Sequence, residues 1–329
     1  MNRTIRLRLI VIVATVLCIC FFFNRIIYSI EPRSDISTDG LSLLLYSDSL
    51  NGRYCKTIHT ALIFGLNDVR IIGKSIDYIN VSVPDKKFEK IYSLHNELKS
   101  FEENKVIVFS DAYDVLFQGN FDSHKDKNSI MFNAEVNCWP FTHPHPSIYN
   151  CPQMQGDSYL KNRTEVPLAC KMSKDKAEAL GILNFERSAI YLNSGLSIGT
   201  ARMYKKLLDA TISLVNTLPA LCKDDQGVFT WLYLQGYYGV TLDYERKLFV
   251  SANEKLFNFN FTTEKGLWSF NESLNYPTAI HFNGDKMYFD KFYSTLLFEK
   301  MDETVGNKFI YAHGKQVLFK DICPLVDYR

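Results

Sequence analysis

Residues 105–110 (KVIVFS) restrict most strongly what this 329-residue chain can fold into. The run is almost continuously apolar and does not alternate with polar residues, which is the pattern of a strand covered on both faces. Strands of this kind belong to sheets packed between two layers of helices. The segment therefore predicts an α/β domain with a mainly parallel sheet and helices on both faces.

The neighbouring segments alternate between strand and helix patterns. Residues 41–46 and 69–72 are short apolar runs typical of buried strands, whereas residues 86–101 have apolar side chains at helical spacing. Further helices are expected at 54–64, 203–217 and 225–235, and further strands at 129–134, 196–198 and 278–281. This order predicts one Rossmann-like, doubly wound domain that binds ligands at the carboxyl ends of its strands.

Composition and charge exclude several classes of protein. The chain is 47% hydrophobic and 22% charged, which is sufficient for a large core and far from the composition of disordered chains. Its 37 Lys and Arg residues against 36 Asp and Glu residues leave a net charge of +1. No broad basic field exists to attract nucleic acid, so we expect no nucleic-acid partner.

The first thirty residues carry a membrane-insertion signal. Arg3, Arg6 and Arg8 precede the apolar run 9–23 (LIVIVATVLCICFFF), and no small-residue cleavage motif follows, which favours an uncleaved anchor over a removed signal peptide. Basic residues stay on the cytoplasmic side. We predict a tail and anchor at 1–30, a stem at 31–40 and a luminal domain at 41–329, in a single-pass type II protein of the endoplasmic reticulum or Golgi membrane.

Glycosylation motifs and cysteines agree with a luminal domain. Sequons of the N-x-Ser/Thr type start at Asn80, Asn162, Asn260 and Asn271. Six cysteines follow the apolar run, and none of them forms a C-x-x-C motif: Cys55, Cys138, Cys151, Cys170, Cys222 and Cys323. An even number fits disulfides in an oxidising compartment. We expect Cys138 and Cys151, which bracket a loop rich in Pro and His, to pair.

Two aspartates, Asp111 and Asp114, directly follow the strand at 105–110. Residues three apart on a continuing strand face opposite ways, so both carboxylates can reach one cation only if the strand ends at Ser110 or Asp111. Two such oxygen ligands suit Mn²⁺ or Mg²⁺ bridging the phosphates of a nucleotide. Two alternatives stay open: capping of the next helix or turn, and a phosphatase nucleophile, although phosphatases use a two-residue spacing.

Six segments resemble the amino-terminal glycosyltransferase domain of the procollagen lysyl hydroxylases in order and approximate spacing. They are VIVFSDAYDVLF, IMFNAEVNCWP, YLNSGLSIGTA, KDDQGVFTWLY, VTLDYERKLF and AIHFNGDK. The resemblance spans roughly residues 41–298. It implies a GT-A type fold, a UDP-sugar donor and Mn²⁺ as cofactor, in a stand-alone domain behind a membrane anchor.

The resemblance also implies roles for residues around the metal and the nucleotide. Asp111, Asp114 and His281 would hold Mn²⁺, and Tyr113 would pack on the uracil base. The residues expected around the diphosphate are Asn283, Gly284 and Lys286, with a further nucleotide-contacting lysine from Lys87, or from Lys90 if the register differs. Phe282 and Asp285 depart from the family, which usually has Gly and Pro there.

Other residues are implied on the sugar side. Asn193, Ser194 and Gly195 would line the donor and acceptor pocket. Asp224 and Asp225 match an acidic run near the transferring sugar, where carboxylates can bind hydroxyls and stabilise positive charge. Trp139 matches a position at the acceptor entrance. The acidic run is shorter here than in the family.

The function that the resemblance implies is transfer of glucose or galactose from a UDP-sugar to a protein- or glycan-linked hydroxyl. The acceptor would be hydroxylysine or galactosyl-hydroxylysine in a glycoprotein or collagen-like chain. The alternative is a catalytically silent luminal scaffold of the same fold that binds a glycan or a partner. Retention of Asp111, Asp114 and His281 together argues against that alternative.

Overall fold

The computed structural model describes most of the chain between residues 40 and 324. The described residues are 40–48, 52–73, 86–121, 124, 126–142, 165–182, 189–217, 224–237, 239–252, 259–262, 267–270, 276–284, 287–299, 304–312 and 314–324. All of them belong to the compact unit Ser37–Arg329, and the other unit, Met1–Ile36, lies outside the described residues. The predicted anchor at 1–30 therefore stays a prediction. Within the described residues, no helix has both the length and the apolar character needed to cross a membrane.

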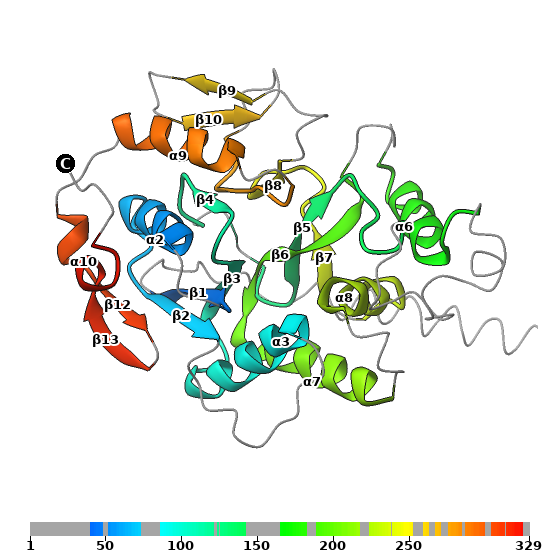
Figure 1. Ribbon diagram of the computed structural model, residues 1–329. Helices are drawn as coiled ribbons and strands as arrows, with labels where there is room; N and C mark the ends of the chain where they lie inside the picture. Colours follow the sequence, from blue (N-terminus) through cyan, green and yellow to red (C-terminus); the bar gives the residue numbers. More distant parts are fainter. Residues whose placement is uncertain are drawn as a thin grey trace, which may run out of the picture. The chain divides into compact units, whose positions relative to one another are not determined.

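A mixed sheet lies at the centre of this unit (Figure 1). Among the described residues it has eight strands in the order β13-β12-β2-β1-β3-β6-β5-β7. Their bounds are β1 Leu41–Ser47, β2 Val69–Gly73, β3 Val106–Asp111, β5 Ile130–Glu135, β6 Tyr191–Thr200, β7 Val240–Leu242, β12 Phe309–Ala312 and β13 Lys315–Leu318. Four of the seven neighbouring pairs are parallel. The α/β fold with a mostly parallel sheet is confirmed, with β6 antiparallel to both of its neighbours.

Helices cover both faces of the sheet. The helices are α2 Gly52–Ile63, α3 Lys86–Glu97, α6 Leu168–Ala179, α7 Ala201–Thr217, α8 Asp225–Leu234, α9 Met287–Glu299 and α10 Phe319–Ile322, with 3-10 turns at Leu98–Ser100 and Val305–Asn307. Apolar side chains of α3, α7 and α8 share one core cluster with β1, β3 and β5. Across the sheet, β2 lies on one side of β1 and β3 lies on the other side. The connection from β1 to β2 and the connection from β2 to β3 therefore run in opposite directions. Right-handed crossovers therefore place α2 and α3 on opposite faces, as Figure 1 shows.

Two smaller sheets complete the described fold. One has the order β4-β11-β8, with β4 at Val115–Phe117, β8 at Phe249–Ser251 and β11 at Ala279–His281. The other pairs β9 Phe259–Thr262 with β10 Leu267–Phe270. The first of these matters for the site, because β4 begins directly after Asp114 and β11 ends at His281.

The predicted elements are present, but the helices α6 and α9 and several short strands were not predicted. The predicted helix at 86–101 ends at Glu97 and continues as a 3-10 turn, and the predicted strand at 196–198 is part of the ten-residue β6. The short strands β4, β7 and β8 were not predicted. Three residues are too few to show a period, and these strands form only because other strands lie beside them.

The predicted Cys138–Cys151 disulfide is wrong. Cys138 is bonded to Cys170 of α6, and both are buried in the core cluster that α8 shares. Helix α6 carries its cysteine to the core by packing on α8, a tertiary contact that spacing along the chain does not reveal. Cys151 lies outside the described residues. A second disulfide joins Cys55 of α2 to Cys323, directly after α10.

These pairings predict the result of peptide mapping on the full chain without reduction. The peptide that contains Cys138 should be linked to the one that contains Cys170, and Cys55 to Cys323. Cys170→Ala should release the Cys138 thiol for alkylation while leaving the Cys55–Cys323 link intact. A Cys138–Cys151 link in the wild-type protein would contradict the structure.

Candidate functional site

Asp111 and Asp114 lie on either side of a bend at the carboxyl end of β3. Asp111 is the last residue of that strand, and the chain turns through residues 112–114 before β4 begins at Val115. The predicted strand end is confirmed. The chain turns here because residues 115–117 are apolar and pair with β11 in a different sheet. The two carboxylates can therefore face the same space.

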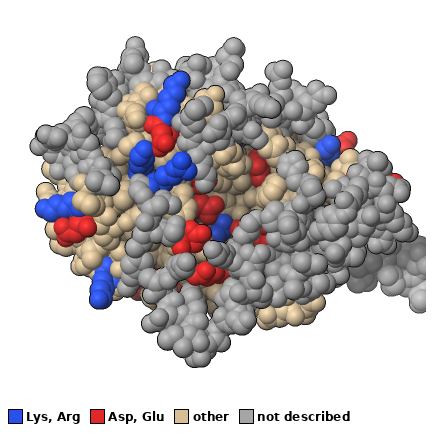
Figure 2. All heavy atoms as spheres, viewed as in Figure 1, with Lys and Arg blue, Asp and Glu red and all other residues tan. Residues whose placement is uncertain are grey.

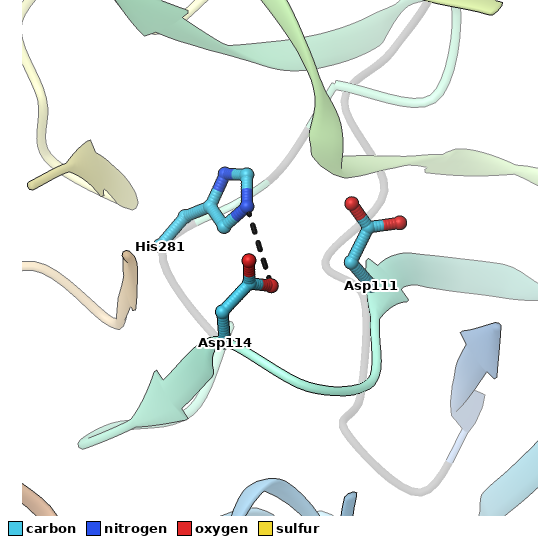
Figure 3. Close-up of side chains that lie close together, drawn as sticks. All are labelled: Asp111, Asp114 and His281. Carbon is cyan, nitrogen blue, oxygen red and sulfur yellow. Dashed lines mark ion pairs between the residues drawn. The ribbon is translucent and has the colours of Figure 1, made fainter. Parts of the chain in front are cut away.

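Strand pairing places His281 beside Asp114. In the register of β11 with β4, His281 lies opposite Val115, and the Phe282 N–H donates to the Asp114 carbonyl at 2.7 Å. His281 Nε2 lies 3.5 Å from Asp114 Oδ1. One ligand atom from each of Asp111, Asp114 and His281 falls within 4.8 Å of the others, and the three side chains point toward a common space (Figure 3).

The buried imidazole of His281 is oriented by Asn193. His281 Nδ1 lies 2.9 Å from Asn193 Oδ1, and the same oxygen accepts the Gly195 N–H at 3.0 Å. An amide oxygen only accepts, so Nδ1 carries a hydrogen and Nε2 faces Asp114. Burial lowers the pKa of His281, but the nearby Asp114, Asp111 and Glu135 carboxylates outweigh it and raise that pKa above its usual value.

Lys90 of α3 connects the bend to α8. Its Nζ lies 2.9 Å from Asp111 Oδ1 and 2.7 Å from Asp225 Oδ2, and Asp225 also accepts from Ser194 Oγ at 2.8 Å. Burial alone would lower the pKa of Lys90, but the charges of Asp111 and Asp225 raise it, so the ammonium stays charged. The Asp111 side chain is 31% exposed, whereas Lys90 is buried behind it.

Two polar residues that were not singled out from the sequence, Glu135 and Gln226, extend the site. Glu135, the buried last residue of β5, accepts from Gln226 at 2.6 Å, from Asn193 at 3.3 Å and from Asn283 at 2.7 Å. Burial raises the pKa of Glu135 to about 7, although these amide donors oppose the shift. Gln226 of α8 also accepts the Ser194 N–H at 3.1 Å. A carboxylate at the end of an apolar strand was the available signal for Glu135, as it was for Asp111.

The two neighbouring acids of α8 have different environments. Asp224 is fully buried and caps the helix, because its Oδ1 accepts the Gly227 N–H at 3.0 Å. Asp225, the first helical residue, faces Lys90 and Ser194. The structure therefore connects Asp225 through Lys90 to the cluster of Asp111, Asp114 and His281, and gives Asp224 a contact within its own helix.

Tyr113 lies inside the bend and is held by its hydroxyl. The oxygen lies 2.7 Å from Ser47 Oγ and donates to Asp48 Oδ1 at 2.9 Å, both at the carboxyl end of β1. The ring is half-buried and its orientation is fixed at the edge of the sheet. Trp139 is also half-buried, and its carbonyl accepts from Gln226 at 3.0 Å.

The segment after β11 is described only in part. Gly284 is exposed and Asn283 is half-buried, whereas Lys286 and the side chain of Lys87 lie outside the described residues. Phe282 is buried and packs its ring against Phe289 and Phe292 of α9. Phe282, which departs from the family pattern, therefore packs in the hydrophobic core against α9.

Negative charge is in excess around the cluster. Asp111, Asp114 and Asp225 contribute three carboxylates, and Lys90 is the basic side chain between two of them. Figure 2 shows acidic side chains gathered near the middle of this face, with a basic side chain among them. A phosphate group could approach here only after this charge has been compensated.

A family model described as "PLOD GT domain" matches residues 47–162, about a third of the chain. The match covers Asp111, Asp114 and Tyr113, as well as Lys90 and Glu135. Together with the α/β sheet, it supports a GT-A type glycosyltransferase domain and a glycosyl-transfer function. His281 lies outside the matched segment, so its place in the candidate site depends on its position beside Asp111 and Asp114 in the structure.

Two solved structures of the galactosyltransferase LgtC are also similar to this chain. One is a complex with donor and acceptor sugar analogues (TM-score 0.38), and the other is an active-site mutant (TM-score 0.40). Each has 9% sequence identity and covers 77% of this chain and 95% of its own. No curated protein matches the sequence.

The capping contact of Asp224 predicts how substitutions there change stability. Asp224→Ala should lower the free energy of unfolding by about 1–2 kcal/mol, because the Gly227 N–H loses its acceptor. Asp224→Asn keeps an oxygen at the same position and should cost distinctly less. Urea unfolding of the full chain measures both variants. Equal losses would show that the charge of Asp224, and not its capping bond, stabilises α8.

Proposed function

We propose that this protein is a Mn²⁺-dependent glycosyltransferase that uses a UDP-sugar. The observation that carries the proposal is the meeting of Asp111, Asp114 and His281 at the carboxyl end of β3, within 4.8 Å of one another. Parallel sheets of α/β proteins bind ligands at this edge. Two of the three residues lie in the segment that matches the PLOD GT domain.

The donor set fits a divalent ion of this type. Two carboxylates and one imidazole suit Mn²⁺, which accepts both oxygen and nitrogen ligands. The hydrogen bond from Nδ1 to Asn193 leaves Nε2 of His281 on the side of the carboxylates. When bound, the ion would neutralise the negative charge that develops on the leaving diphosphate.

The chain's own residues divide between the nucleotide and the sugar. Tyr113 would offer its ring to the uracil base, with its hydroxyl held by Ser47 and Asp48. Asn283 and Gly284 would lie along the diphosphate, together with Lys286. The buried ammonium of Lys90, which pairs with Asp111 and Asp225, would add positive charge beside the carboxylates.

The sugar would lie on the side of Asp225. Its carboxylate is held in place by Lys90 and Ser194, so it is oriented before substrate arrives. A fixed carboxylate can bind a sugar hydroxyl or stabilise positive charge at the anomeric carbon. By the family resemblance, the donor would be UDP-glucose or UDP-galactose, and the acceptor hydroxylysine or galactosyl-hydroxylysine near Trp139.

The proposed localisation of the glycosyltransferase domain is the lumen of the endoplasmic reticulum or Golgi. The apolar run at 9–23 with its preceding arginines supports an anchor of type II topology. The two disulfides support an oxidising compartment.

Metal and nucleotide should stabilise the full chain together. UDP at about 100 times its Kd should add about 2.7 kcal/mol, a rise in Tm of roughly 5 °C, and only when Mn²⁺ is present. Asp111→Asn and Asp114→Asn should abolish this rise and the hydrolysis of UDP-sugars, because each removes a charged ligand. Asp209→Asn, on the exposed side of α7, is the matched control and should respond like wild type. No stabilisation of the wild-type protein by UDP with Mn²⁺ would refute the proposal.

The pH dependence of Mn²⁺ binding tests the third ligand. Asp114, Asp111 and Glu135 raise the pKa of His281, so in the metal-free protein its proton competes with Mn²⁺ up to a pH above 6.5. Affinity should therefore rise by up to about tenfold per pH unit below that pKa and level off above it. Isothermal titration of the full chain at several pH values measures this slope.

His281→Ala should bind Mn²⁺ more weakly and with a shallower pH dependence. His95→Ala is the control, because His95 pairs with Asp209 on the surface, and it should keep the wild-type slope. An unchanged slope in His281→Ala would remove His281 from the ligand set.

A further inference from the structure

The segment Asn193, Ser194 and Gly195 of β6 contacts several parts of the site at once. The pairing of β5 with β6 jumps from Phe132 opposite Ser197 to Asn133 opposite Asn193, so a bulge begins directly after Asn193 and includes Ser194 and Gly195. Bulges re-aim side chains and are common beside active sites. Asn193 and Ser194 are both buried, and their polar groups are engaged with other residues of the protein.

Asn193 uses both ends of its amide on neighbouring side chains. Its Oδ1 accepts from His281 Nδ1 at 2.9 Å and from the Gly195 N–H at 3.0 Å. Its Nδ2 donates to the buried Glu135 at 3.3 Å, which fixes which end of the amide faces the imidazole. Since Oδ1 cannot donate, the contact selects the neutral tautomer of His281 that has its lone pair on Nε2.

Gly195 limits the position of the same imidazole from another side. A Cβ atom at residue 195 would lie 2.2 Å from Cε1 of His281, and 2.7 and 2.8 Å from its two ring nitrogens. No side chain fits there unless the ring moves away. The close approach of the β6 backbone to the ring therefore requires glycine at this position.

We propose that Asn193 and Gly195 are positioning residues for the metal ligand His281, and that they do not contact the sugar. Asn193 holds the tautomer and the ring plane, and Gly195 leaves the space that the ring occupies. Partners of this kind orient metal-bound imidazoles through the nitrogen that does not bind the metal. The inference rests on the proposed function, because it assumes that His281 binds a divalent ion.

The test measures Mn²⁺ binding to the full chain without UDP or sugar. The EPR signal of free Mn²⁺ reports how much of the ion remains unbound. Asn193→Ala and Gly195→Ala should each weaken binding by about 10- to 100-fold. The ¹⁴N coupling of an imidazole to the Mn²⁺ that still binds should also be lost or reduced. A merely structural role for Asn193 would leave that coupling intact.

Asn133→Ala is the matched control. Asn133 lies opposite Asn193 in the strand pairing and is equally buried, but its Nδ2 donates to Ser251 at 2.8 Å. Loss of this amide creates a similar cavity and removes a hydrogen bond to Ser251, the residue paired with His281 across β8 and β11, but none to the imidazole itself. Mn²⁺ affinity should therefore stay within about threefold. Thermal unfolding is followed for each variant, and Gly195→Ala decides the outcome if Asn193→Ala does not fold.

A double-mutant cycle separates this inference from the proposed function. In a His281→Ala background, Asn193→Ala should have no further effect on Mn²⁺ affinity, because Asn193 acts through the imidazole. Wild-type affinity and ¹⁴N coupling in Asn193→Ala, with a raised KM for the UDP-sugar, would overturn the inference and return Asn193 to the sugar. Absence of Mn²⁺ binding by the wild-type protein would overturn the proposed function as well.

Discussion

The pairing of β11 with β4 is the constraint on which the rest of the site depends. It holds β11, which ends at His281, against β4, which follows the bend after β3. A further hydrogen bond from the Phe282 N–H to the Asp114 carbonyl extends this pairing. His281 and Asp114 thus approach through backbone hydrogen bonds, before any charge interaction is considered. Phe282 then anchors α9 beside the same strand through its ring contacts.

Around this contact, the polar side chains hold one another in place. Lys90 connects Asp111 to Asp225, and Glu135 accepts from three amides. Buried charges and amides are costly unless they are fully paired, so each member of the network restricts the others. The likeness to the PLOD GT domain supports glycosyl transfer, and the cluster of Asp111, Asp114 and His281 offers the ligands of a candidate divalent-metal site beside this network.

Sequence reasoning was most successful where a signal is local. The strand end at Asp111 followed from the change from an apolar run to two carboxylates, and α3 followed from its helical periodicity. It was wrong about the partner of Cys138 because α6 reaches Cys138 through packing on α8. Asp224 and Asp225 look alike in the sequence, and only the start of α8 between them makes one a cap and the other a site residue.

By itself, the sequence determined the α/β class, the carboxylate pair at a strand end and, through its resemblance, the candidate third ligand His281. The first two follow from residue type and spacing over a few positions, whereas His281 was implied only by the resemblance. The tertiary structure decided which groups meet: Asn193 and Gly195 against His281, Lys90 between two aspartates, and Glu135 beneath three amides. The contacts made from β5, β6 and β11 depend on strand register and on the bulge in β6, because a shift of one residue would turn a strand side chain to the other face. Lys90 reaches the two aspartates from helix α3.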